Sequence, residues 1–377
     1  MSRSLSGVAA GLALGLFSVA LTLVIAEWFL RATILPVESV DPFAQVALVA
    51  DPVIGYRLQP NQQTIMTNGH FSEEVRTDEA GLRDLYDERY SNPGIIAIGD
   101  SQTFGHGVRV EATWVERLQA NLHMNVVNTG VFGYGVSQYE HVLRRVHDAG
   151  QPIRLVLYAM SWNDVESGTF PPDLLVVEDG FLVRNPAYSR AGDGEQSLQE
   201  RVMRSRFART FVNRTALGKL LRLAGNSLLG RLGVAVHGMD ERLVRSSEQT
   251  KQKLLALNDL LESLGARLVM VHIGNANLVM PDLWKDYQRR YRHSRFFAQE
   301  AFADWAEGHG IVFEDAILAL EARYLESGME RTSVILPVDA HYGAGGHDVI
   351  AAVFAKTLRE RGLDEQPPQR NSRAGIE

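Results

Sequence analysis

Short apolar runs alternate with amphipathic stretches through the central and C-terminal parts of the chain. After each run, apolar positions recur at the spacing of one helix face. This alternation is typical of βαβ units, in which helices join the parallel strands of one sheet, so we predict an α/β domain. The predicted strands cover residues 94–99, 125–128, 154–159, 266–273 and 310–313. The predicted helices cover residues 112–122, 137–149, 247–264, 295–308 and 346–361.

The N-terminus carries a different pattern, an uncharged apolar run over residues 8–26. Such a run is about long enough to cross a bilayer as a helix. Arg3 precedes it, and the charges of Glu27 and Arg31 after it cancel, which favours a cytoplasmic N-terminus and an exported body. A cleaved signal peptide is the alternative, but its apolar region is expected to span only about 7–15 residues. We therefore predict a single transmembrane anchor over residues 1–31, in the inner (plasma) membrane, with the remaining chain on the periplasmic or extracellular side.

The chain after the anchor divides by composition. Residues 32–90 are rich in Pro, Gly and polar residues, and we interpret them as an irregular lead-in packed on the main domain; this segment is called the lead-in below. The main domain covers residues 91–363, with a helical insertion at about residues 165–245. The tail, residues 364–377, has the composition of a disordered segment.

The insertion has an unusual charge pattern. Residues 201–239 hold seven Arg and one Lys but no acidic residue, with apolar residues at near-helical spacing. One interpretation is a basic amphipathic helix on an anionic membrane. The other, which we favour, is a helical cap whose apolar face packs on the domain and whose arginines are solvated. An active-site lid is compatible with both.

Charge and composition exclude several classes of site. The net charge of the 377-residue chain is −7, which argues against a general nucleic-acid binder. The chain has no cysteine, which excludes disulfides, thiolate zinc sites and cysteine nucleophiles. No cluster of His, Asp and Glu has the spacing of metal ligands, so we predict neither a metal nor a cofactor.

Candidate chemistry begins with "GIIAIGDSQTFGHG", residues 94–107, which places Ser101 directly after the first predicted strand. Ligands of open parallel sheets bind beyond the carboxyl ends of the strands, and the helix that follows would direct its N-terminal amides there. A serine at such a turn is more often a helix cap than a nucleophile. A nucleophile also needs a base, an orienting acid and an oxyanion hole from elsewhere in the chain.

Three further segments supply those groups at predicted strand ends. "VVNTGVFGYGVSQYE" brings Gly133, "LYAMSWNDV" brings Asn163, and "LPVDAHYGAGG" brings Asp339 and His341. In this set His341 would take the hydroxyl proton of Ser101, while Asp339 would hold the tautomer of His341. The backbone N–H groups of Ser101 and Gly133 and the side-chain amide of Asn163 would form the oxyanion hole.

These four segments resemble the conserved blocks of the SGNH (GDSL-type) hydrolase superfamily, over roughly residues 94–360. The anchor, the "GLRD" of the lead-in and the "TFGHGV" after the serine are similar to membrane-anchored bacterial members. The resemblance implies a flavodoxin-like three-layer α/β/α sandwich and hydrolysis or transfer of acyl esters. It matches the nucleophile to Ser101, the base to His341, the acid to Asp339, and the oxyanion donors to Gly133 and Asn163.

The chain departs from the family pattern at two places. Gln102 stands where many members have Leu, and the acid and base are spaced Asp-x-His instead of Asp-x-x-His. Related sequences that look like polysaccharide O-acyltransferases also carry Asp-x-His. His347 is a rival base, but its place in a predicted helix favours a packing or capping role.

Other residues near the motifs have weaker claims. His106 lies on the turn after Ser101, and Asp100 is interpreted as an acceptor for its own turn. Asp164 either orients Asn163 or is solvated. Trp162 either lines a pocket or belongs to the core.

Three functions remain open on the sequence. The first is a serine esterase that works through an acyl-Ser101 intermediate. The second is an O-acyltransferase for exported polysaccharide or envelope glycan, for which a membrane-bound partner would deliver the acyl group. The third is a non-catalytic glycan-binding module on the same fold. The expected partners are accordingly an acyl ester or a glycan and the membrane.

Overall fold

A computed structural model of the chain describes part of its length, in two compact units. The described residues are 15, 17–29, 45–68, 70–83, 85–86, 90–166, 170–178, 180–188, 239–288, 293–337 and 340–365. One unit groups residues 1–45, 66–72 and 189–234, and the other groups residues 46–65, 73–188 and 235–377. In the first unit, residues 17–29 are helical. Within the described residues, no helix has both the length and the apolar character needed to cross a bilayer.

The second unit is built on a five-stranded parallel sheet. Its strands are β5 (Ser91–Ile98), β6 (Met124–Asn128), β7 (Leu155–Ser161), β10 (Arg267–Gly274) and β11 (Val312–Asp315). The order across the sheet is β11-β10-β7-β5-β6, which is the doubly wound order of flavodoxin-like folds. All five predicted strands are confirmed. The central strands β7 and β10 read as continuous apolar runs because they are buried on both faces, whereas β11, at the edge of the sheet, is half-buried.

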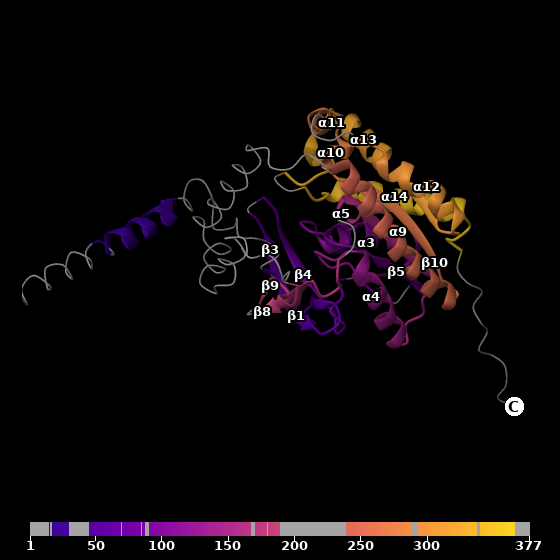
Figure 1. Cartoon of the computed structure of the whole chain (residues 1–377), viewed down its shortest axis with the longest axis horizontal. Helices are drawn as coiled ribbons and strands as arrows, with labels where there is room; N and C mark the ends of the chain where they lie inside the picture. The colour runs from indigo at the N-terminus through magenta and orange to yellow at the C-terminus, as the bar shows by residue number, and fades with distance from the viewer. Residues whose placement is uncertain are drawn as a thin grey trace, which may run out of the picture. The chain divides into compact units, whose positions relative to one another are not determined.

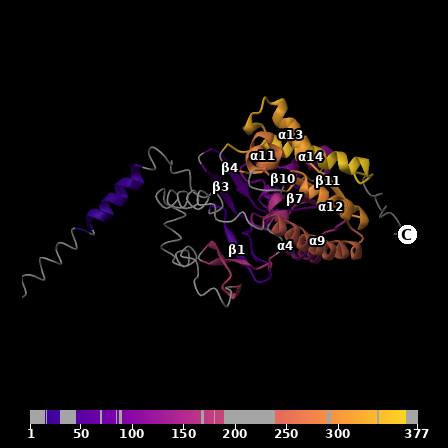
Figure 2. The ribbon, with the colours of Figure 1, turned by 45° about the horizontal axis from the view of Figure 1, so that its top comes forward.

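Helices cover both faces of this sheet (Figures 1 and 2). Leu155 and Leu157 of β7 share a core cluster with Trp114 and Phe354, whose rings stack 4.6 Å apart. Tyr158 follows Leu157 in β7, so its side chain is on the opposite face, where it contacts Tyr139 with ring centroids 5.2 Å apart. The first face carries α3 (Trp114–Leu122), α13 (Ile317–Glu326) and α14 (Ala344–Glu360). The second face carries α4 (Val136–Asp148), α9 (Met239–Ser263) and α12 (Phe297–Gly308).

Several short elements were not predicted. The lead-in, expected to be irregular, contains two strand pairs. β1 (Leu48–Asp51) pairs antiparallel with β2 (Gly55–Leu58), and β3 (Gln63–Thr67) pairs with β4 (Ser72–Arg76). The first pair turns where Asp51 Oδ1 accepts the N–H groups of Val53 and Ile54 and where Gly55 has a φ of +81°. Strands this short carry too few residues to show an alternation.

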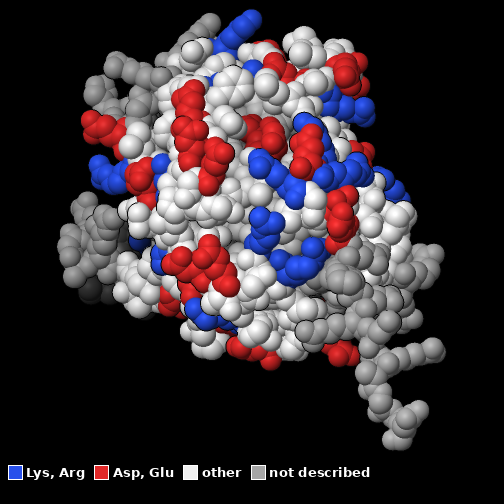
Figure 3. Space-filling view, turned by 90° about the vertical axis from the view of Figure 1, so that its right-hand side faces the viewer, with Lys and Arg blue, Asp and Glu red and all other residues white. Residues whose placement is uncertain are grey.

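The insertion also differs from the predicted helical segment. Its described part contains the antiparallel pair β8 (Leu175–Glu178) and β9 (Phe181–Arg184), and α9 begins at Met239, before the predicted start. The basic segment 201–239 lies outside the described residues except for its last position, and residues 366–377 of the tail lie outside as well. Acidic and basic side chains of the described residues are interspersed on the face drawn in Figure 3.

Candidate active site

Ser101 is the first residue of α2 (Ser101–Phe104), directly beyond the carboxyl end of β5. Gly99 makes the sharp turn with a φ of +156°, and a Cβ there would lie 2.0 Å from Thr103 Oγ1. Asp100 is the N-cap, and its Oδ1 accepts the N–H of Gln102 at 2.9 Å. The capping role therefore belongs to Asp100, which leaves the hydroxyl of Ser101 for other chemistry.

His341 reaches that hydroxyl from the far end of the chain. Its Nε2 lies 2.7 Å from Ser101 Oγ, although 240 positions separate the two residues. The segment is held by an isolated bridge between Ile335 and Tyr342. The N–H of Tyr342 also donates to Gln102 Oε1 at 3.1 Å. Gln102, the departure from the family pattern, thus ties the histidine segment to α2.

The orienting acid and the rival base have different outcomes. Asp339 lies outside the described residues, so its role stays a prediction. His347 lies in α14, fully buried, and its Nδ1 accepts the N–H of Trp114 at 3.1 Å. Burial, with minor contributions from Arg83, His341 and Arg117, lowers the pKa of His347 to about 3. His347 is therefore a neutral packing histidine that completes the first turn of α3.

The turn after β6, residues 129–135, is called the glycine turn below, and it packs on α2. A Cβ on Gly130 would lie 2.4 Å from the backbone N of Phe104, and Asn128 Nδ2 donates to Thr103 O at 3.0 Å. Gly133 has a φ of +78°, a conformation that favours glycine. Within the described residues, the N–H groups of Gly133 and Ser101 donate to no acceptor, so both are available to a ligand.

Asn163 follows β7 on the short helix α5 (Trp162–Glu166). Its Nδ2 donates to Asp100 Oδ2 at 3.0 Å, and its Oδ1 lies beside the hydroxyl of Ser161. An amide nitrogen carries two hydrogens, so one remains for a ligand. The predicted oxyanion donor is therefore linked to the residue that precedes the serine.

Asp164, next to Asn163, is buried rather than solvated. Its Oδ2 lies 3.1 Å from both the N and the Oγ of Ser161. Burial and the nearby carboxylate of Asp100 raise the pKa of Asp164 to about 8, so it is protonated at neutral pH. The protonated carboxyl can donate to Ser161 Oγ, which in turn donates to Asp100 Oδ2 at 2.7 Å. Asp164 thus supports the group that holds Asn163.

His106 lies next to the proposed base, a position that the sequence did not predict. Its ring is buried and lies against the ring of His341, with centroids 4.2 Å apart and planes inclined by 40°. Its backbone N–H donates to Ser101 O at 3.0 Å.

Trp162 is also buried, and its ring lies 5.3 Å from that of His293.

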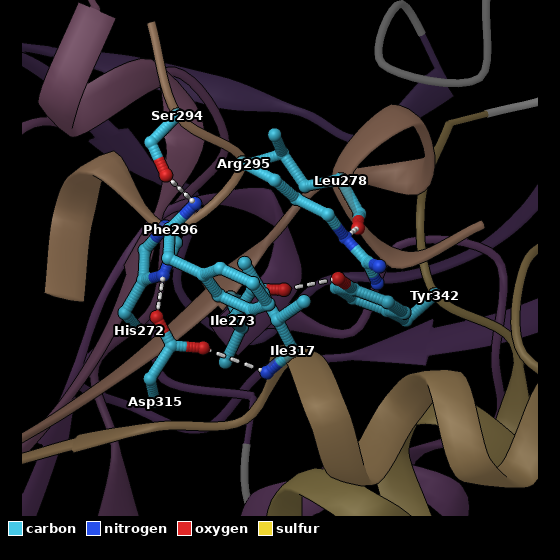
Figure 4. Close-up of polar contacts among 9 residues, drawn as sticks. All are labelled: His272, Ile273, Leu278, Ser294, Arg295, Phe296, Asp315, Ile317 and Tyr342. Carbon is cyan, nitrogen blue, oxygen red and sulfur yellow. Dashed lines mark hydrogen bonds and ion pairs between the residues drawn. The ribbon is translucent and has the colours of Figure 1, made fainter. Parts of the chain in front are cut away.

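A second histidine–aspartate pair lies at the ends of β10 and β11 (Figure 4). His272 Nδ1 is 2.9 Å from Asp315 Oδ2, and Asp315 Oδ1 accepts the N–H of Ile317 at 2.8 Å. Sequence reasoning missed this pair, although both residues stand at strand ends as Ser101 and Asn163 do. The described residues contain no group of three or more His, Asp or Glu side chains that could hold a metal ion.

Of the comparisons with known proteins, only the comparison with solved structures finds similar proteins. No family model and no curated protein matches the chain. A G-D-S-L family lipolytic protein from Veillonella parvula is 14% identical, over 71% of this chain and 96% of that one, with a TM-score of 0.38. An esterase from a Pseudoalteromonas species is 12% identical, over 72% and 98%, with a TM-score of 0.36. An acetyl xylan esterase from Geobacillus stearothermophilus is 14% identical, over 73% and 96%, with a TM-score of 0.35. At these TM-scores the likenesses decide neither the fold nor the activity of this chain.

Proposed function

We propose that the protein is a serine esterase of the SGNH type that hydrolyses acyl esters through an acyl-Ser101 intermediate. One observation carries the proposal: the 2.7 Å contact between His341 Nε2 and Ser101 Oγ at the carboxyl end of a doubly wound parallel sheet. A general base must lie within hydrogen-bond reach of the proton that it takes, and this contact meets that requirement. The buried, neutral His347 offers no competing base.

In the acylation step, His341 takes the proton of Ser101 as Oγ attacks the carbonyl carbon of the ester. The tetrahedral oxyanion would accept hydrogen bonds from the N–H groups of Ser101 and Gly133 and from Asn163 Nδ2. Each such donor typically lowers the barrier by about 2.7–4 kcal/mol. The carbon–oxygen bond to the alcohol then breaks, and the imidazolium of His341 returns its proton to the leaving oxygen.

Deacylation repeats these steps with water. His341 takes a proton from the water molecule, whose oxygen attacks the acyl carbon, and the released Ser101 Oγ recovers the proton. In this scheme Asp339 stabilises the imidazolium. The Asp100, Ser161 and Asp164 network keeps the amide of Asn163 in one orientation throughout.

We propose further that a membrane anchor tethers this domain on the periplasmic or extracellular side. The support is the apolar run 8–26 and the helical residues 17–29, whose apolar side chains are exposed. Phe17, Val24 and Trp28 are 64%, 65% and 71% exposed. A helix with apolar side chains all round is typical of a membrane segment.

The test is turnover of p-nitrophenyl acetate by the full-length protein in detergent. We expect turnover that Ser101→Ala abolishes, while Ser137→Ala, a buried serine on α4, leaves it intact. Candidate glycans are added as acceptors, because acyl transfer to a glycan would replace hydrolysis with transfer. A folded protein with no turnover under any of these conditions would contradict the proposal.

A further inference from the structure

The lead-in places a buried arginine behind the serine. Arg83 is 1% exposed, and its guanidinium donates to the carbonyl oxygens of Phe104 at 2.9 Å, Gly105 at 2.6 Å and Val108 at 2.8 Å. It also lies over the ring of Phe104, 4.8 Å from the centroid. Burial lowers its pKa to about 10, so the group remains charged at neutral pH. A buried charge is tolerated when it is hydrogen-bonded, and here the two terminal nitrogens of the guanidinium donate to these carbonyls and, at 3.4 Å, to Glu74 O, while Nε has no partner.

These carbonyls lie in the turn that follows Ser101, on both sides of His106. The N–H groups of Gly105 and His106 both donate to Ser101 O, at 3.1 and 3.0 Å. Arg83 therefore fixes the carbonyl side of a turn whose N–H side is fixed by the serine itself. The same turn carries His106, whose ring packs against that of His341. A shift of this turn would therefore move both Ser101 and the His106 ring that packs against His341.

The lead-in also reaches the glycine turn. The hydroxyl of Tyr56, a fully buried residue of β2, donates to Phe132 O at 2.9 Å. In return the hydroxyl of Tyr134 donates to Tyr56 O at 2.6 Å. These two bonds hold the residues on either side of Gly133. A Cβ on Gly133 would lie 2.7 Å from the Tyr56 hydroxyl, so the tyrosine fits a glycine there.

We infer that the lead-in is a working part of the active site, with Arg83 and Tyr56 as its positioning residues. Arg83 acts on the Ser101–His341 pair through the turn after α2, and Tyr56 acts on the oxyanion donor Gly133. Neither residue is assigned contact with substrate. This inference rests on the proposed function, since it concerns how well that chemistry is aligned.

The test for Arg83 measures ester turnover and Ser101 labelling by a fluorophosphonate, both per folded molecule. Misplacement of reacting groups by about 1 Å can reduce a rate by about 10²-fold. We expect Arg83→Met to lower kcat and the labelling rate by about 10- to 100-fold with KM nearly unchanged. Arg83→Lys should recover part of the loss, because it keeps the charge but not the planar fork of donors.

A matched control separates positioning from stability. Arg295 is another largely buried arginine, and it donates to the carbonyl oxygen of Leu278 (Figure 4). It also donates to Val279 O and pairs with Glu321, so it binds the last carbonyls of the four-residue helix α10 (Ala276–Val279). We expect Arg295→Met to lower the free energy of unfolding but to leave kcat per folded molecule within about 2-fold of the wild type.

Tyr56→Phe tests the proposed role of Tyr56 in positioning Gly133, because the variant lacks the hydroxyl but keeps the ring. We expect kcat to fall by about 10-fold with KM unchanged, because a displaced oxyanion donor acts on the transition state. Tyr324→Phe, which removes a hydroxyl bonded to Asp282 on the α13 side, is the control.

The outcomes distinguish the two proposals. An inactive wild type whose serine does not label would overturn the proposed function. An active wild type with Arg83→Met and Tyr56→Phe variants that match it per folded molecule would overturn this inference alone. If Arg83→Met fails to fold, Arg83→Lys and Tyr56→Phe decide the matter, and wild-type rates in both would overturn the inference.

Discussion

Asp100 Oδ2 accepts a hydrogen bond from Asn163 Nδ2 at 3.0 Å, which joins the end of β5 to the end of β7. The same carboxylate caps α2, the helix that Ser101 begins. One side chain thus aligns the proposed nucleophile and one proposed oxyanion donor. A ligand between them would meet two groups whose relative position does not depend on its own binding, which is the condition for preorganised catalysis.

Asn163→Ala should lower kcat by about 10²- to 10³-fold with little change in KM, because the lost donor acts on the oxyanion rather than on the ground state. Steady-state kinetics on p-nitrophenyl acetate measure the change. Asn258→Ala, which removes an amide bonded to Glu262 on α9, is the matched control. Equal losses in both variants would mean that Asn163 has only a structural role.

Comparison of Gly133→Ala with Gly150→Ala separates the effect of backbone strain at a positive φ from the effect of a steric clash with Tyr56. Both glycines have a positive φ, +78° and +79°, so each substitution should cost about 1–2 kcal/mol of backbone strain. A Cβ at Gly150 meets no atom within 4 Å, whereas one at Gly133 meets the Tyr56 hydroxyl at 2.7 Å. We expect Gly133→Ala to be the less stable of the two in urea unfolding, and we expect the loss of activity in Gly133→Ala alone. Tyr56→Phe in the Gly133→Ala background should restore part of the stability.

The raised pKa of Asp164 predicts a pH dependence of stability. The ordinary pKa of an aspartate is 3.8, and that of buried Asp164 is about 8, so between these values the folded state holds a proton that the unfolded state has lost. The free energy of unfolding therefore falls as pH rises through this window, by up to about 1.4 kcal/mol per pH unit. Asp164→Asn removes this contribution.

Urea midpoints at pH 5, 6.5 and 8 measure the effect. The difference between wild type and Asp164→Asn should shift in favour of the variant as pH increases. A difference that is constant over this range would show that the carboxyl of Asp164 is already ionised at pH 5.

The sequence predicts the sheet well because of how its strands are buried. Strands such as β7, buried on both faces, leave a short apolar run that is easily recognised in the sequence. The pairing of Ser101 with His341 was predictable for a related reason: each segment follows or precedes a recognisable element at the same sheet edge. Asp339 remains a prediction on the same grounds.

Arg83, Tyr56 and His106 could not be found in the same way. Arg83 and Tyr56 bond to backbone carbonyls, which every residue carries, so no pattern of residue types marks their partners. The ring of His106 packs against the ring of His341, and a contact between residues so far apart in the chain cannot be predicted from the sequence. Residues that support the site but lie outside its sequence motifs can therefore be identified only from the folded structure.

The most direct test of the central claim is the rate at which a fluorophosphonate labels the protein, followed by intact mass and mapped to its site. The Ser101–His341 contact predicts one adduct, on Ser101. His341→Ala should abolish labelling, while His347→Asn should label at a rate near that of the wild type in the folded fraction. Labelling that survives His341→Ala, or an adduct on another residue, would contradict the account.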